Sequence, residues 1–598
     1  MRIGLGCMRL STELARDEST ALATLAAAVD AGIALFDTAR AYAEGEADLG
    51  HNERLIAKAW RACATLPAAR VVTKCGMRRD GGAWIPDGRA KRIADDAAAS
   101  VEALGGVPID LLLLHAPDPR VPLATTARAL ARALETGVAR GIGVSNVSRK
   151  QLEEVLAHAP VSAVEIALGA YDDLALRNGV VAYCLDRGIE VLAHAPLGGP
   201  ERATRLVKDP VLARIAGGHP GLGAADVFVA YLLAVRPGIV PVVGARRPET
   251  IARFRAADAL VLGEEDLALL DERFARLGDL RRPRVIGERR RRDVEVALLM
   301  GVPGAGKSRR AEAFVARGYQ RLNRDTTGGT LRGIARTLEE RLAAGADRVV
   351  LDNTYVTRAT RSDVLRAASS VGARVRCVFF DTPLQEAEVN VVLRMIERFG
   401  RVVEPEEMTD LARDDPAAMA PRVLSRMTRD LEPPMPDEGF ADIEVVPFVR
   451  DQAAGGHPGV AMAVDALEGA GAAGRREVEM NRLLADVPSG APCLLYAWKP
   501  DASDGSLAAI DALASRIRGT GRFVEVAICR HPAGPPICWC RPPLPGMFLA
   551  FAHRHRVELR ASTLLGGSST DRRLARVLGM SFVELERADH PTSPGGRY

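Results

Sequence analysis

The sequence predicts an α/β protein in three parts: a closed (β/α)8 barrel, a parallel sheet around a phosphate-binding loop, and a smaller C-terminal α/β domain. Three observations lead to this prediction. Short apolar runs alternate with amphipathic stretches from residue 3 to about 245, a second alternation begins at residue 294, and Cys and His residues cluster at 529–540. The 598 residues are enough for several domains.

The first part contains eight apolar runs, each as short as a strand. Parallel strands joined by crossover helices give this alternation. Eight repeats match a closed (β/α)8 barrel, predicted over residues 1–280. The alternative, a doubly wound open sheet, more often has fewer strands and a Gly-rich first turn. The runs are residues 3–7, 33–37, 70–74, 110–115, 141–145, 163–167, 190–194 and 239–243.

The composition narrows the class of protein. Hydrophobic residues make up 47% and charged residues 26%, the balance of a soluble globular protein. The sequence shows no secretory signal and no apolar run long enough to span a membrane. A net charge of +4 predicts no bulk attraction to nucleic acid. The nine cysteines form no dense framework, so we expect a reducing, cytoplasmic location.

Changes in composition suggest the domain boundaries. Residues 281–293 are rich in Arg and predict a basic linker, interpreted as a solvated charge run, with a nucleic-acid contact as the alternative. The second domain is expected over 294–450. Residues 451–475 are rich in Gly and Ala and are interpreted as another linker, which leaves 476–598 as the third domain.

Ionisable residues stand at the ends of successive predicted barrel strands. Asp37 ends the second run, with Tyr42 five residues later, and Lys74 and His115 end the next two runs. The carboxyl ends of barrel strands meet at one mouth, where the chemistry of such barrels takes place. Four ionisable groups converging there are hard to explain by packing alone.

These segments resemble the aldo-keto reductases, with FDTARAYAEGEADLGHNERLIAKAW, VVTKCG, DLLLLHAPD, GIGVSN and IVPVVGARRPE carrying the resemblance. The resemblance implies NADPH-dependent reduction of a small carbonyl compound, or the reverse oxidation. Tyr42 matches the general acid of the family, Lys74 and Asp37 match the pair that lowers the pKa of this tyrosine, and His115 matches the group that orients the carbonyl. A cation beside a phenol stabilises the phenolate, which is consistent with these roles.

The same resemblance implies a set of cofactor residues and three departures. Glu165 replaces the Gln of the nicotinamide site, His194 replaces the aromatic residue that stacks on nicotinamide, and Phe254 replaces an Asn that contacts adenine. Arg246 and Arg247, in the segment IVPVVGARRPE, favour NADPH over NADH. The implied cofactor residues are Ser145 and Asn146 for the carboxamide, Leu197 and Gly198 over the pyrophosphate, and Gly244, Ala245, Arg246 and Arg247 near the 2′-phosphate.

The second part carries a phosphate-binding motif. Residues 301–308 read GVPGAGKS, between an apolar strand and a helix-like run, and fit G-x-x-x-x-G-K-[ST]. Gly301, Gly304 and Gly306 allow backbone N–H groups to surround the phosphates of ATP. Lys307 reaches the β- and γ-phosphates, and Ser308 holds Mg²⁺.

Residues 322–333, 349–368 and 430–448 resemble the kinase domain of polynucleotide kinases, some relatives of which phosphorylate small molecules. The resemblance implies transfer of the γ-phosphate of ATP to a hydroxyl, typically the 5′-OH of DNA or RNA. Val392 replaces a lid arginine of the family, and Tyr355 replaces a frequent Asn. The implied residues are Asp325 as general base, Arg332 near the acceptor phosphate, Asp352 for Mg²⁺ water or substrate, and Arg394 and Arg398 as lid arginines.

The C-terminal part contains a predicted zinc site. Cys529, His531, Cys538 and Cys540 lie within twelve residues and supply three thiols and one imidazole. This donor set closes a tetrahedral Zn²⁺ site and leaves no open position, so the site is expected to be structural. The alternative is a reduced cluster of cysteines without metal.

Residues 485–590 resemble the zinc-containing haloacid-dehalogenase-like (HAD-like) phosphatases. Pro542 stands where that family has a Lys, Gly567 replaces an Asp of the Mg²⁺ loop, and Asp465 is what remains of the D-x-D nucleophile motif, with no clear strand before it. Hydrolysis needs all three groups. We therefore expect a catalytically inactive phosphatase fold used for binding or assembly.

Three functions stay open from the sequence. The first is a multidomain enzyme that combines carbonyl reduction with phosphorylation of a nucleic-acid end during repair. The second is a fusion of a small-molecule reductase and kinase. The third is a scaffold that senses NADPH and nucleic-acid ends. The oligomeric state and the carbonyl substrate are undetermined.

Overall fold

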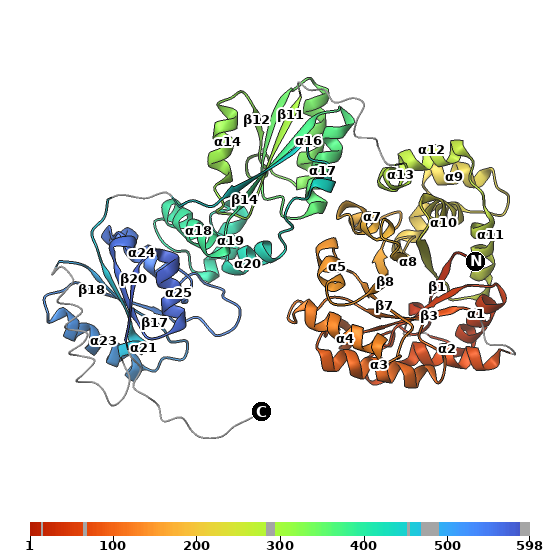
Figure 1. Ribbon diagram of the computed structural model, residues 1–598, viewed down its shortest axis with the longest axis horizontal. Coiled ribbons are helices and arrows are strands. Elements are labelled where there is room, and N and C mark those ends of the chain that lie inside the picture. The colour runs from red at the N-terminus through yellow and green to blue at the C-terminus, as the bar shows by residue number, and fades with distance from the viewer. Residues whose placement is uncertain (14–15, 64–67, 283–293, 451–454, 468–489, 586–598) are drawn as a thin grey trace. The chain divides into compact units, whose positions relative to one another are not determined.

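The computed structural model describes all residues except 14–15, 64–67, 283–293, 451–454, 468–489 and 586–598. The predicted basic linker therefore lies almost wholly outside the described residues. The chain forms two compact units, Met1–Glu288 and Arg289–Tyr598, whose elements are labelled in Figure 1. In the described part of the chain, every helix is too short or too polar to cross a bilayer.

The first unit is a closed barrel of eight parallel strands, in the order β1-β10-β9-β8-β7-β6-β3-β2. This finding confirms the predicted (β/α)8 barrel, and every predicted apolar run contains or overlaps one of its strands. The strands are β1 (Gly4–Gly6), β2 (Leu35–Asp37), β3 (Arg70–Cys75), β6 (Leu111–Leu114), β7 (Gly141–Ser145), β8 (Val161–Ala167), β9 (Glu190–His194) and β10 (Ile239–Gly244).

Apolar side chains alternate between the two sides of each barrel strand, as strand geometry requires. Leu35, Val72, Leu113 and Leu192 fill the inside of the barrel, whereas neighbours such as Phe36 and Val71 pack outward against the helices. The helices are α1 (Glu18–Asp30), α2 (His51–Ala62), α3 (Ala90–Leu104), α4 (Leu123–Glu135), α5 (Arg149–Leu156), α6 (Leu174–Arg177), α7 (Val180–Leu185), α8 (Gly199–Leu206), α9 (Pro210–Gly217), α10 (Ala224–Val235), α11 (Pro248–Ala259), α12 (Glu264–Arg273) and α13 (Ala275–Arg281).

An antiparallel hairpin follows β3 and was not predicted. It consists of β4 (Met77–Asp80) and β5 (Ala83–Pro86). Gly81 and Gly82 form its turn with φ of 53° and 85°, values that suit glycine and a two-residue hairpin turn. The hairpin lies at the carboxyl end of the barrel strands, where the predicted site residues are.

The second unit begins with a five-stranded parallel sheet in the order β12-β13-β11-β14-β15. Its strands are β11 (Glu295–Met300), β12 (Gln320–Leu322), β13 (Arg348–Asp352), β14 (Arg374–Asp381) and β15 (Asp442–Pro447). Its helices are α14 (Lys307–Val315), α15 (Arg324–Thr327), α16 (Leu331–Ala343), α17 (Arg358–Ser370), α18 (Leu384–Phe399), α19 (Pro405–Asp414) and α20 (Pro421–Arg429).

A second five-stranded parallel sheet, ordered β18-β17-β16-β19-β20, completes this unit. Its central strand β16 lies inside the predicted linker 451–475, so the described part of that segment, residues 455–467, is not only a linker: a short apolar run there forms a buried strand. Residues 451–454 and 468–475 lie outside the described residues. The elements are β16 (Val460–Ala463), β17 (Cys493–Trp498), β18 (Val524–Cys529), β19 (Thr563–Gly566), β20 (Ser581–Glu584), α21 (Val464–Leu467), α23 (Asp504–Arg518), α24 (Gly546–His555) and α25 (Ser569–Leu578).

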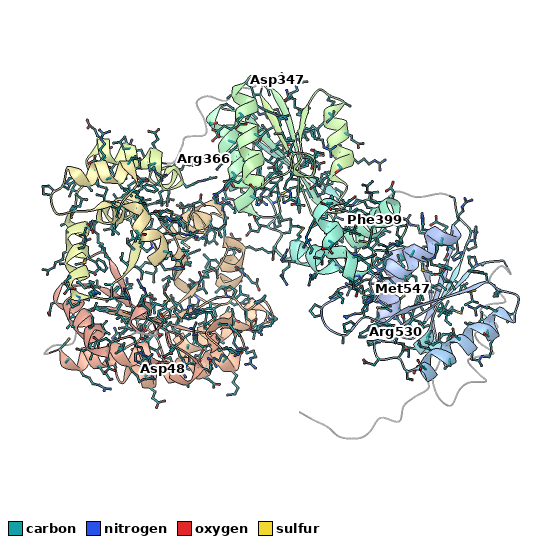
Figure 2. The ribbon with its side chains drawn as sticks, turned by 180° about the vertical axis from the view of Figure 1, so that it is seen from behind. Asp48, Asp347, Arg366, Phe399, Arg530 and Met547 are labelled. Carbon is teal, nitrogen blue, oxygen red and sulfur yellow. The ribbon has the colours of Figure 1, made fainter. Side chains whose placement is uncertain are left out.

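The two sheets of the second unit share one cluster of apolar side chains. Helix α18 packs against α24 and α25, and Phe399 and Met547, labelled in Figure 2, belong to this cluster. The buried Trp539 donates its indole N–H to the carbonyl of Met419, at 2.7 Å. The C-terminal sheet is therefore packed onto the preceding one and does not form the separate unit that the sequence suggested.

Candidate functional site

The four predicted catalytic residues of the barrel meet at its mouth. Lys74, at the end of β3, is 1% exposed, and its ammonium donates hydrogen bonds to the carboxylate of Asp37 and to the hydroxyl of Tyr42. The distance from Lys74 Nζ to Tyr42 Oη is 3.0 Å. The ring of His115 stands edge to face with that of Tyr42, with centroids 5.7 Å apart. Parallel strands of one barrel bring these residues to the same rim.

Glu165 belongs to this group as well. It lies on β8 and is buried, with Oε2 3.1 Å from Lys74 Nζ. One ammonium therefore faces two carboxyl groups, from Asp37 and Glu165. Beyond this contact with Lys74, Oε2 has no hydrogen-bond partner among the described residues.

The pKa of Tyr42 departs from the prediction. Burial, and then the charge of Asp37, raise this pKa above its usual value, and Lys74 offsets only part of the shift. Lys74 does lower this pKa, as expected, but Asp37 raises it, and the burial of the phenol, which the sequence did not show, outweighs the effect of Lys74. A neutral phenol is nevertheless the form that donates a proton.

The other groups at the mouth also have shifted pKa values. Burial and the nearby Glu165 raise the pKa of Asp37 to about 8, although Lys74 opposes the shift. Burial and then the charge of Lys74 lower the pKa of His115 to about 3. The imidazole of His115 is therefore neutral at pH 7 and has one N–H to donate.

The expected nicotinamide residues lie together on the adjacent strands. Asn146, with φ of 58°, donates its side-chain amide to the carbonyl of His115 and to the hydroxyl of Ser145, both at 3.0 Å. Its Oδ1 is 3.2 Å from Nε2 of His194. Left-handed backbone outside glycine is strained and concentrates at functional sites. Glu165 is the neighbour of Ser145 in the strand register.

The expected phosphate contacts lie farther around the rim. Gly198, with Leu197 before it, is the N-cap of α8, and Arg247 is the N-cap of α11. Arg246 and Arg247 border a cavity of about 200 Å³, next to Gly244 and Ala245 at the end of β10. Phe254 is buried among the outer apolar side chains of the barrel. Backbone N–H groups at a helix start and two guanidinium groups fit the phosphates of NADPH.

Sequence reasoning missed two residues at the mouth, Arg79 and Trp84. They face each other across the unpredicted hairpin, with Arg79 Cζ 3.8 Å from the indole centroid. The ring of Trp84 lies 6.1 Å from that of Tyr42 and 5.6 Å from that of His115, between centroids. The Asp-Gly-Gly turn at 80–82 was the signal that could have found the hairpin.

The phosphate-binding loop connects β11 to α14 as its motif predicts. Gly301, Gly304 and Gly306 all have φ above 80°, and a Cβ on Gly304 would lie 2.7 Å from the carbonyl of Ala387. Lys307 donates to the carbonyls of Gly301 and Val302 at 2.9 and 2.8 Å. Burial lowers its pKa to about 8. Ser308 lies in the first turn of α14.

Three of the predicted phosphoryl-transfer residues act electrostatically on Lys307. The charges of Asp352, Arg394 and Asp325 all affect its pKa. Asp352 is buried at the end of β13 and accepts hydrogen bonds from Arg321 and Asn323. The half-exposed carboxylate of Asp325 lies on α15. These groups fit a site that holds Mg²⁺, ATP and an acceptor hydroxyl.

The remaining residues of this set have other neighbours. Arg332 lies 3.7 Å from Asp363, and Arg398 forms an ion pair with Asp415. Val392, the departure from the lid, is fully buried, so this position packs in the core. Tyr355 is also buried, and its hydroxyl accepts a hydrogen bond from Asn353 at 3.3 Å.

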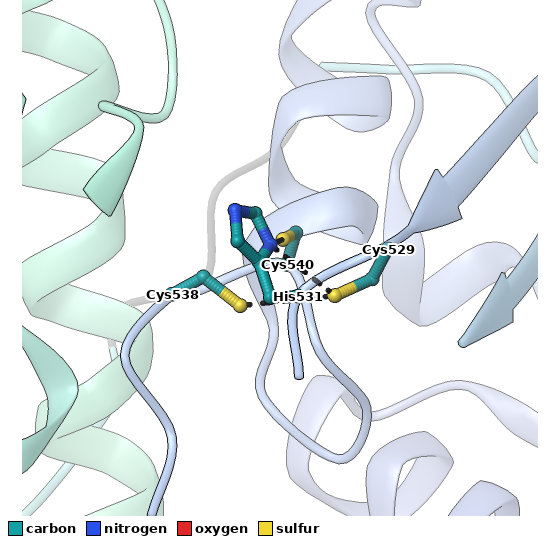
Figure 3. A group of neighbouring side chains, drawn as sticks. All are labelled: Cys529, His531, Cys538 and Cys540. Carbon is teal, nitrogen blue, oxygen red and sulfur yellow. Dashed lines mark hydrogen bonds between the residues drawn. The ribbon is translucent and has the colours of Figure 1, made fainter. Parts of the chain in front are cut away.

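The four predicted zinc ligands form a compact cluster at the end of β18 and in the segment that follows it (Figure 3). All four ligand atoms lie within 4.8 Å of one another. Cys529 Sγ is 3.5 Å from His531 Nδ1 and 3.7 Å from Cys538 Sγ, and Cys540 Sγ is 3.2 Å from His531 Nδ1. Sulfurs on one tetrahedral zinc stand about 3.8 Å apart. Donor set and spacing both fit Zn²⁺.

One of the three positions that mark the predicted inactive phosphatase, Asp465, differs from the prediction. Asp465 does follow a strand, β16, and Lys499 lies 2.6 Å from its carboxylate. A carboxylate and an ammonium therefore meet at the carboxyl edge of this sheet. Gly567 and Pro542 place no ionisable side chain there.

Fold and site together define a (β/α)8 protein with a buried Tyr–Lys–Asp–His group, joined to a P-loop protein. Residues 2–273 match the aldo/keto reductase family, and residues 296–413 match an AAA domain. The chain thus contains an aldo/keto reductase domain followed by a P-loop-type domain.

Two curated relatives are reductases. Aldo-keto reductase YhdN of Bacillus subtilis is 30% identical over 33% of this chain and 58% of its own length. The 6-dehydroglucose reductase of Agrobacterium fabrum is 29% identical over 43% of this chain and 88% of its own. Among solved structures, an aldo/keto reductase from Klebsiella pneumoniae in complex with NADP and acetate is 22% identical, covers 45% of this chain and 90% of its own, and gives a TM-score of 0.39.

Proposed function

We propose that the barrel reduces the carbonyl group of a small molecule with NADPH. The hydrogen bond from Lys74 to Tyr42, at 3.0 Å inside a buried group that includes Asp37, carries this proposal. NADPH needs polar groups along its length. Ser145 supplies a hydroxyl, Asn146 an amide and Arg246 a guanidinium, and the start of α8 supplies backbone N–H groups. When bound there, NADPH supplies the hydride.

The residues of the chain position the carbonyl and supply the proton. The hydroxyl of Tyr42 donates its proton to the carbonyl oxygen as negative charge develops there, and the ammonium of Lys74 stabilises the phenolate that results. His115 is neutral and donates its N–H to the same oxygen, which fixes the direction of the carbonyl. The carboxyl group of Asp37 accepts a hydrogen bond from Lys74 and holds the ammonium beside the phenol.

We expect Glu165→Gln to change the pH profile of reduction. With its pKa at about 8, Asp37 holds a proton at neutral pH and loses it above. The added negative charge then raises the pKa of Tyr42 further, so Tyr42 becomes a weaker acid and kcat/KM falls above about pH 8. Removing Glu165 lowers the pKa of Asp37 and removes this alkaline limb. Steady-state rates measured from pH 6 to 10 give the pH dependence of kcat/KM for both proteins.

Glu165→Asp is the matched control, because it keeps a carboxylate on β8. We expect it to retain the alkaline limb. Superimposable profiles for the wild type and Glu165→Gln would show that Glu165 does not control the protonation of the site.

We further propose that the P-loop domain transfers the γ-phosphate of ATP to a hydroxyl, with the 5′-OH of a nucleic-acid end as acceptor. Lys307 and the loop glycines hold the phosphates, Asp352 and Ser308 hold Mg²⁺, and Asp325 accepts the proton of the hydroxyl. Arg394 offsets the charge that develops on the phosphoryl group. The resemblance of residues 322–333 and 349–368 to polynucleotide kinases supports this choice of acceptor.

Transfer of label from γ-labelled ATP tests the acceptor. A 5′-OH oligonucleotide should become labelled, and its 5′-phosphorylated counterpart should not. Labelling of sugars or other small alcohols in place of the oligonucleotide would identify a small-molecule kinase. If the barrel and the kinase act in one repair reaction, an aldehyde on a damaged nucleic-acid end should also oxidise NADPH.

The C-terminal sheet is proposed to be an inactive HAD-like phosphatase fold that a structural zinc ion stabilises. Cys538→Ser is expected to lower bound zinc from one equivalent per chain to none and to reduce the thermal stability of the second unit. Structural zinc contributes directly to folding. Atomic emission gives the metal content. The fluorescence of Trp539, next to Cys538, reports local unfolding.

Cys63→Ser is the control for this experiment. Cys63 lies in the barrel and outside the ligand cluster, so zinc content and stability of the second unit should not change. Wild-type protein that binds no zinc, or Cys538→Ser protein that binds a full equivalent, would contradict the assignment.

A further inference from the structure

A buried guanidinium without a counterion lies beside the catalytic group of the barrel. Arg79 is 7% exposed, and its Nε and Nη1 have no hydrogen-bond partner among the described residues. Arg79 forms no ion pair with any side chain of the described residues. Glu46 is close, but its carboxylate accepts from the backbone N–H of Arg79 at 2.7 Å and lies 3.6 Å from Arg92. Buried charges are normally paired, because desolvation of an unpaired one is costly.

The hairpin directs Arg79 toward the site. Side chains of a strand alternate between its two faces, so Arg79 and its cross-strand partner Trp84 share one face, and Arg78 lies on the other. The face with Trp84 borders the rings of Tyr42 and His115. The charge of Arg79 also contributes to the low pKa of His115, which places the guanidinium close to that ring.

Trp84 contacts the face of the guanidinium of Arg79 but provides no acceptor for its N–H groups. The two groups stack, which stabilises the face of the guanidinium. Its N–H donors lie in the plane of the group, however, and stacking leaves them without acceptors. An anion with two oxygens would complete this arrangement in the manner of a carboxylate or a phosphate.

The expected pyrophosphate contacts of the cofactor lie away from Arg79. The hairpin follows β3, and the expected pyrophosphate contacts follow β9. Three strands lie between β3 and β9 in either direction around the barrel. The group that reaches Arg79 therefore belongs to the molecule placed between Tyr42, His115 and Trp84.

We propose that Arg79 binds an anionic group of the carbonyl substrate, so that the barrel acts on short aldehydes or ketones with a carboxylate or phosphate a few bonds from the carbonyl. This inference rests on the reductase function proposed above. Trp84 shields the ion pair from water and packs against the chain between the two groups.

Binding tests the proposal without turnover. The full-length protein is titrated with benzoate, phenyl phosphate and uncharged benzyl alcohol, and tryptophan fluorescence is recorded. Benzoate or phenyl phosphate should give a saturable change, which identifies carboxylate or phosphate as the preferred anion, and Arg79→Met should abolish it. Arg78→Met is the matched control: Arg78 pairs with Asp80 on the opposite face at 3.2 Å, and its loss should change nothing. The proposal is overturned if Arg79→Met protein still shows the fluorescence change, or if the wild type shows no fluorescence change.

Kinetics give a second measure. The kcat/KM ratios of 4-carboxybenzaldehyde to benzaldehyde and of glyceraldehyde 3-phosphate to glyceraldehyde are compared in the wild type, Arg79→Met and Arg79→Lys. Arg79→Met should lower the ratio for the preferred anion about 10- to 100-fold, as expected for loss of charge-assisted hydrogen bonds, and Arg79→Lys should restore part of it. Unchanged ratios with active enzyme overturn the anion site alone. Benzoate binding that depends on Arg79, with no aldehyde reduced, supports the anion site and refutes the reductase function.

Thermal unfolding separates binding from a structural role. Because the guanidinium is buried without a counterion, Arg79→Met should leave the unfolding midpoint unchanged or raise it. A midpoint lowered together with the turnover of benzaldehyde would identify Arg79 as a structural residue and overturn the proposal.

Discussion

Replacing Tyr42 with Phe should lower kcat for NADPH-dependent aldehyde reduction by about 10² to 10⁴, the usual contribution of a positioned general acid. The substitution removes one oxygen from a buried site and leaves the ring, and with it the contacts to Trp84 and His115. The binding of NADPH, measured by fluorescence titration, should change little. NADPH oxidation followed at 340 nm gives the rate.

The second unit provides an internal control for this variant. Phosphorylation by the P-loop domain should be unaffected by Tyr42→Phe, because Tyr42 lies in the other compact unit. Aldehyde reduction at the wild-type rate would show that another group supplies the proton.

Replacing Lys307 with Ala should reduce phosphoryl transfer about 10²- to 10³-fold, the range for loss of one preorganised charged donor. Lys307 is buried in the loop, where burial lowers its pKa to about 8. The phosphates of ATP would favour the charged ammonium, so binding of ATP should raise this pKa. Label transfer from γ-labelled ATP measures the loss.

The barrel serves as the reciprocal control, since NADPH oxidation by Lys307→Ala protein should equal that of the wild type. Undiminished label transfer would mean that the loop at 301–308 does not hold the transferred phosphate. A loss of both activities would point instead to unfolding of the chain.

The barrel was predictable because its pattern is local. Each strand is a short apolar run, and Asp37, Lys74 and His115 lie at or next to strand ends, so alternation and spacing were sufficient to predict that these three residues meet at the mouth. The β4–β5 hairpin was missed because three of the four residues of β4 are charged. The strand β16 was missed because it is a run of only four residues inside a segment rich in Gly and Ala.

The electrostatics could not be predicted from the sequence. The pKa of Tyr42 depends on burial and on the distances to Asp37 and Lys74, and the contact of Glu165 with Lys74 depends on how β8 is placed against the barrel interior. The unpaired guanidinium of Arg79 has no sequence signature, because only the structure shows which carboxylates fail to reach it.

Transfer of deuterium tests the central claim most directly, namely that the barrel mouth reduces carbonyl groups. Full-length protein is incubated with an aldehyde and NADPH that carries deuterium at both C4 positions, and the alcohol is analysed by mass spectrometry. The expected result is one deuterium on the former carbonyl carbon with wild-type protein and at least a hundredfold less labelled alcohol with Tyr42→Phe. No labelled alcohol from charged or uncharged aldehydes, or equal labelling by the two proteins, would contradict it.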